Sequence, residues 1–70
     1  MSISYYDFKN LPEHLQHEIV IAEGKVISET IKDKLKFVLY QVSIFSVEIV
    51  YNTVTDKVES LSAFQSRGNL

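Results

Sequence analysis

The side chains best suited to chemistry lie together in the run 13–18, which reads EHLQHE. On a helix, His14, His17 and Glu18 are spaced at i, i+3 and i+4, so that all three can reach one divalent metal ion. The spacing differs from that of the zinc-protease helix, in which histidines four residues apart flank a glutamate. No fourth ligand accompanies them, and a solvated helix face explains the same residues. We therefore expect no metal site, and a metal-dependent hydrolase ranks third among the functional hypotheses.

Other catalytic arrangements are not indicated. Serines are plentiful, but nothing places one beside a histidine and an orienting acid. Gly24 and Gly68 cannot form a phosphate-cradling loop. Glu48 lies among apolar neighbours and is expected to face solvent rather than to act as an acid of raised pKa. The sequence thus predicts a protein that is not an enzyme and that holds no cofactor.

A second set of residues points toward nucleic acid. Lys32, Lys34 and Lys36 alternate along the chain and lead toward Tyr40, a pattern similar to sheet surfaces that stack single-stranded bases. Lysines at the start of a strand also block edge-to-edge aggregation, and Asp33 offsets them. The net charge of −2 and the pI of about 5.5 argue against a general nucleic-acid binder. Binding of single-stranded nucleic acid is therefore the alternative function.

Length and composition favour one small domain that associates. A chain of 70 residues predicts a single domain, 1–70, whose core supplies about 3–5 kcal/mol, and without cysteine no disulfide can reinforce it. Oligomerisation and a well-idealised core are the remaining ways to stabilise it, so a protein partner and a homo-oligomer are expected. The N-terminus has neither the basic nor the apolar region of a secretory signal, and the apolar run 37–51 is too short to span a bilayer. We expect a cytoplasmic protein without a membrane association.

One helix is indicated near the N-terminus. Residues 1–9 are expected to form an ordered lead-in that docks an aromatic side chain on the core. Asn10 as N-cap, Pro12 in the first turn and Gly24 after the last predict a helix over 12–23. Its apolar residues have the spacing of a buried helix face and form a stripe of Leu11, Leu15, Ile19 and Ala22, widened by Val20 and Ile21. A helix that continues past Gly24 is the alternative.

The rest of the chain predicts an antiparallel meander. Its strands are expected at 25–32, 36–42, 46–52 and 57–64, because these segments are rich in β-branched and aromatic residues. Turns are expected at 33–34 and 52–56 and near Ser43, where one long bent strand is the alternative. The predicted fold class is α+β, with one N-terminal helix packed on a four-stranded antiparallel sheet and a polar tail after Phe64.

Alternation along the strands divides the side chains between two faces. Val47, Ile49 and Tyr51 are assigned to the face under the helix. A bulge near Ser60 is expected, since the alternation changes phase there. The opposite face is predicted to carry an apolar patch with nothing to cover it, formed by Val38, Tyr40, Val42 and Val50.

The sheet segments also carry a resemblance. The stretches LYQV, FSVEIVY and DKVESLSAF, within residues 39–64, are similar to short uncharacterised bacterial proteins of Bacteroidetes type. Those proteins pair a helix that begins at Leu-Pro with such a sheet, and the likeness covers about residues 8–66. Ser46 departs from the pattern, in which an aromatic residue is usual. The resemblance implies a compact α+β fold and no particular activity.

The leading hypothesis is thus a non-enzymatic protein-interaction module. Its expected interface is the apolar patch on the open sheet face, through which two copies of the chain would associate across a two-fold axis.

Overall fold

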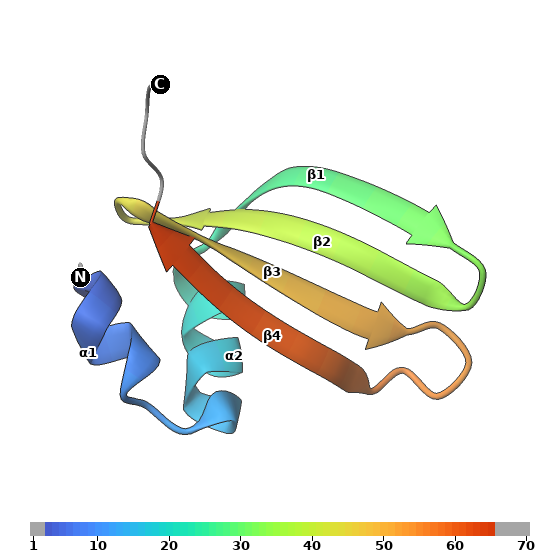
Figure 1. Cartoon of the computed structure of the whole chain (residues 1–70), viewed down its shortest axis with the longest axis horizontal. Coiled ribbons are helices and arrows are strands. Elements are labelled where there is room, and N and C mark those ends of the chain that lie inside the picture. Colours follow the sequence, from blue (N-terminus) through green and yellow to red (C-terminus); the bar gives the residue numbers. More distant parts are fainter. Residues whose placement is uncertain (1–2, 66–70) are drawn as a thin grey trace.

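The computed structural model describes residues 3–65, which form two helices followed by a four-stranded antiparallel sheet (Figure 1). The elements are α1 (Tyr5–Lys9), α2 (Glu13–Glu23), β1 (Lys25–Lys32), β2 (Leu35–Val42), β3 (Phe45–Asn52) and β4 (Val58–Gln65). Each strand pairs with its neighbour in the sequence, in the order β1-β2-β3-β4. The predicted α+β fold is confirmed, whereas most of the predicted polar tail lies outside the described residues.

The N-terminal lead-in contains a short helix, α1. The Ser4 hydroxyl accepts a hydrogen bond from the backbone N–H of Asp7 and so caps its first turn. Phe8 is fully buried, with its ring centroid 5.1 Å from that of Phe45 on β3. The expected aromatic docking is therefore made by Phe8. Asn10 was predicted to cap the start of the second helix, and this is wrong. It ends the first helix instead, because its backbone N–H donates to carbonyls of α1.

Helix α2 begins after Pro12, one residue later than predicted, and ends at Gly24. Gly24 has an extended backbone (φ −78°, ψ 153°) that any residue can adopt, so the predicted left-handed C-terminal glycine is wrong. A Cβ at this position would lie 2.6 Å from the carbonyl oxygen of Val20 and 3.3 Å from Cδ2 of Tyr40. Glycine is required here by close packing. The alternative of a helix that continues through Gly24 is also wrong.

The turns lie where the sequence predicted them. Asp33, Ser43 and Asp56 have positive φ (58°, 54° and 62°), as tight turns require. The break near Ser43 is a two-residue turn, so a single long strand is excluded. β4 carries the expected bulge at Glu59, the unpaired residue between partners of Val50 and Tyr51.

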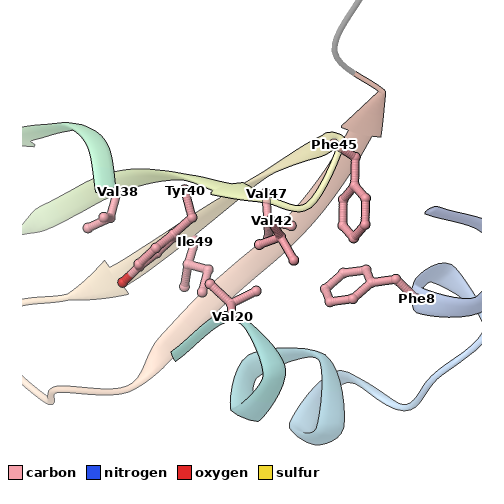
Figure 2. Close-up of a cluster of buried hydrophobic side chains, with 8 residues drawn as sticks. All are labelled: Phe8, Val20, Val38, Tyr40, Val42, Phe45, Val47 and Ile49. Carbon is pink, nitrogen blue, oxygen red and sulfur yellow. The ribbon is translucent and has the colours of Figure 1, made fainter. Parts of the chain in front are cut away.

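The core lies between one face of the sheet and the two helices. Figure 2 shows Phe8 from α1 and Val20 from α2 pointing toward six side chains of the sheet. These six are Val38, Tyr40, Val42, Phe45, Val47 and Ile49. The prediction that Val47 and Ile49 lie under the helix is therefore confirmed.

Three residues assigned to the open sheet face belong instead to this core. Val38 and Val42 are at most 1% exposed and Tyr40 is 9% exposed. The cause is the pairing of β2 with β3, in which Val38 faces Ile49 and Tyr40 faces Val47. The prediction placed Val38 on the same face as Val50, the residue next to Ile49, and a difference of one residue in register exchanges the faces of a whole strand.

The predicted apolar stripe of α2 is also turned away from the sheet. Val20 is the buried residue of this helix, whereas Leu15 is 37% exposed and Ala22 is exposed. Gln16 faces inward because its Nε2 donates to the carbonyl of Phe8 at 2.8 Å. Since α1 fills the core beside α2, the core takes only Val20, with Ile19 partly buried beside it, from α2.

Candidate functional site

The face of the sheet opposite the helices is an apolar surface that no described element covers. Both helices lie on one side, near the β2–β3 turn (Figure 1). Cross-strand partners share a face, so the pairs Phe37–Val50 and Leu39–Glu48 lie on the uncovered side. We call this surface the open face.

The open face has an apolar centre and a polar margin. Its apolar residues are Leu35, Phe37, Leu39, Val50 and Phe64. Their exposure ranges from 8% for Val50 to 44% for Phe64, so the centre is flat and partly self-shielded. β1 contributes Ser28, Thr30 and Lys32 along one margin, and β4 contributes Ser60 and Ser62 along the other. Such a sheet face suits contact with another sheet face.

Only one of the four predicted interface residues lies on the open face. Val50 is there, as expected, next to Phe37. Phe37 and Leu39 are absent from the predicted interface, yet they lie at the centre of the open face. The signal that identifies them is the tight turn at Ser43-Ile44, because it fixes Val42 opposite Phe45 and so sets the phase of β2.

The predicted nucleic-acid residues do not form one surface. Lys32 pairs with Leu35 on the open face, whereas Lys36 pairs with Tyr51 on the helix-covered face. Lys34 lies in the turn between β1 and β2. Tyr40 is buried to 9% exposure, so its ring offers no platform for a base.

The histidines of α2 are also separated. His14 is exposed, while His17 turns inward, and its Nε2 lies 3.2 Å from the hydroxyl oxygen of Tyr51. Within residues 3–65, no three histidine, aspartate or glutamate side chains are grouped as metal ligands. The part of the chain that the structure describes also has no helix long and apolar enough to cross a bilayer.

A polar hollow lies on the helix-covered side of the sheet, between strand residues and the β3–β4 turn. Its volume is about 260 Å³, and its lining includes Lys36, Val38, Tyr40 and Tyr51. The hydroxyl oxygens of Tyr40 and Tyr51 are 3.4 Å apart and share a hydrogen bond. Burial is the main cause that raises the pKa of Tyr51 well above the ordinary value for a phenol, and the hydrogen bond with Tyr40 adds to it. The hydroxyl of Tyr51 therefore stays protonated and links α2 to the sheet; a base for catalysis would need the opposite shift.

Comparisons of the chain with models of protein families, with curated proteins and with solved structures give no match.

Proposed function

We propose that the protein is a non-enzymatic interaction module that binds a second copy of itself through the open face. The observation that carries the proposal is the row of Phe37, Leu39 and Val50, apolar side chains at the centre of a sheet face without a covering layer. Two such sheets can stack about 10 Å apart and interdigitate these side chains, as the layers of a β-sandwich do.

The small size of the core supports the same conclusion. Within residues 3–65, nine hydrophobic residues are buried, and the chain of 70 residues has no cysteine. Small domains of this kind draw stability from association when disulfides and metals are absent. Closing the open face would add a second buried layer to the first.

The charges of the open face indicate how two copies would be oriented. Glu48 lies on β3 near the centre, whereas Lys25 and Lys32 lie on the same face along β1. A two-fold axis that runs parallel to β2, between the two stacked sheets, would set β3 of one copy over β1 of the other. Each Glu48 would then approach a lysine of the second copy rather than the other Glu48, which would repel it.

The test is sedimentation of the full chain at micromolar concentration. We expect a dimer, and we expect Leu39→Lys to convert it to a folded monomer, because the interface would then have to bury an ammonium group, a cost that its cross-strand partner Glu48 offsets only in part. Ile44→Lys is the matched control, since Ile44 is 76% exposed at the tip of the β2–β3 turn and should leave the dimer intact.

A monomer for the unaltered chain at these concentrations would contradict self-association. If that monomer also binds mixed single-stranded oligonucleotides with an affinity that falls as salt rises, the result would favour the nucleic-acid alternative.

A further inference from the structure

The outer side of α2 carries an apolar stripe that faces away from the sheet. With about 100° between successive helical residues, Leu15 and Ala22 project on the side opposite Val20, whereas Ile19 lies between the two sides and also packs partly against the core. Together with Leu11 they line a hollow of about 370 Å³. The spacing is that of a helix face buried against another element, yet no described element covers the hollow.

Polar residues occupy the inner side of the same helix. Gln16 donates to the carbonyl of Phe8, and His17 contacts the Tyr51 hydroxyl, so only Val20 is buried there. The helix therefore shows more apolar surface outward than inward. This arrangement is costly for an isolated helix in water and becomes favourable once the stripe is covered.

The charges beside the stripe define what can cover it. Glu18 and Glu23 are the two charged residues that line the hollow, and α2 contains no lysine or arginine. Glu23 lies in the last turn, where the helix dipole is already negative, and Lys25 is the first basic residue beyond it. Pairing of two α2 helices would bring these glutamates together, so a second copy of α2 is a poor occupant.

We propose that the outer face of α2 binds a basic amphipathic helix of a partner protein. Its leucine or isoleucine side chains would fill the stripe, and its lysines or arginines would meet Glu18 and Glu23. Helix α2 has 11 residues and is therefore about 16 Å long, which matches three turns of such a partner. The site lies on the side of the molecule opposite the open face, so it does not depend on self-association; a dimer would present it twice.

The test uses a fluorescently labelled helical peptide of leucine and lysine at amphipathic spacing, with an otherwise identical leucine–glutamate peptide for comparison. Fluorescence anisotropy should show binding of the basic peptide and none of the acidic one. Leu15→Ala should weaken binding about tenfold, because most of a buried leucine side chain is lost. Ile21→Ala is the matched control, since Ile21 is 57% exposed on α2 but lies off the stripe.

The electrostatic part of the proposal is tested by Glu18→Gln with Glu23→Gln, which should weaken binding severalfold and reduce its salt dependence. Glu29→Gln on β1 is the matched control and should change neither. Equal binding of the basic peptide to the unaltered chain and to Leu15→Ala would show non-specific adhesion and overturn the proposal. Failure to bind, or equal binding of the acidic peptide, would overturn it too, as would an oligomer of the chain that Leu15→Ala dissociates.

Discussion

Gly24 and Val20 approach each other so closely that a Cβ on the glycine would lie 2.6 Å from the valine carbonyl oxygen. The backbone N–H of Gly24 donates to that same oxygen at 2.7 Å, so the contact closes the last turn of α2. The helix thereby ends against β2 and turns directly into β1.

We expect Gly24→Ala to destabilise the protein by about 1–3 kcal/mol, because backbone must move to admit the new methyl group. The extended φ and ψ of Gly24 suit alanine, and the lower entropy of the unfolded chain would by itself favour folding by about 0.4–1 kcal/mol. The cost of the clash is larger than this gain, so the net effect is destabilising. Urea unfolding measures the change. Glu23→Ala, one residue earlier and exposed, should stay within about 0.5 kcal/mol, and an equally small effect of Gly24→Ala would show that the contact relaxes freely.

The Tyr51 hydroxyl joins α2 to the sheet through His17 and also meets Tyr40. Tyr51→Phe removes both hydrogen bonds while keeping the ring, so we expect a loss of about 1 kcal/mol in the free energy of unfolding. Tyr6→Phe is the control, because Tyr6 is 69% exposed and should tolerate the change. Equal stability of the two variants would mean that the hydroxyl of Tyr51 contributes nothing to the fold.

The raised pKa of Tyr51 predicts a particular response to alkali. Below the ordinary phenol pKa of 10.0, folded and unfolded chains both hold this proton. Above it, the unfolded chain releases the proton first, so the free energy of unfolding falls as pH rises toward the folded pKa. Tyr51→Phe lacks this contribution, and the stability difference between the two proteins should therefore narrow above pH 10. Urea titrations at several alkaline pH values test this; a constant difference would contradict it.

Helix α1 packs on the sheet through Phe8, which is fully buried against Phe45, and through Tyr5, whose ring also contacts Phe45. Phe8→Ala should cost about 3–5 kcal/mol, which is comparable to the whole stability expected of so small a core. We therefore expect a largely unfolded chain by circular dichroism, with Phe8→Leu folded but weakened. Tyr6→Ala, in the same helix but exposed, should remain folded, and a folded Phe8→Ala would show that α1 is dispensable.

The fold could be predicted because its signals are local. Gly24, the turn at Asp33-Lys34 and the β-branched strands each mark an element by residue type, so the order of helix and strands follows from the chain. Helix α1 was missed because its five residues have no apolar period; only the burial of Phe8 and the Ser4 cap identify it.

The faces could not be assigned with the same certainty because they depend on register. Alternation shows that Val38 and Tyr40 lie on the same face of the sheet. It does not show whether that face is the one of Val47 and Ile49 or the one of Val50. That choice rests on whether Phe45 belongs to the turn or to β3, and Ser43-Ile44 carries no glycine, proline or asparagine to mark a two-residue turn. The orientation of α2 depended likewise on the space that Phe8 occupies in the core.

Val38 and Leu39 are consecutive residues whose replacement should have opposite consequences. Val38 is 1% exposed beneath the helices, so Val38→Lys would bury an unpaired ammonium group and should leave the chain unfolded. Leu39 lies on the open face, where lysine can reach water in a monomer, so Leu39→Lys should keep the native circular dichroism spectrum while losing the dimer. Spectra and sedimentation of the two variants give the comparison directly. A folded Val38→Lys together with an unfolded Leu39→Lys would reverse the faces of β2 and remove the basis for the proposed interface.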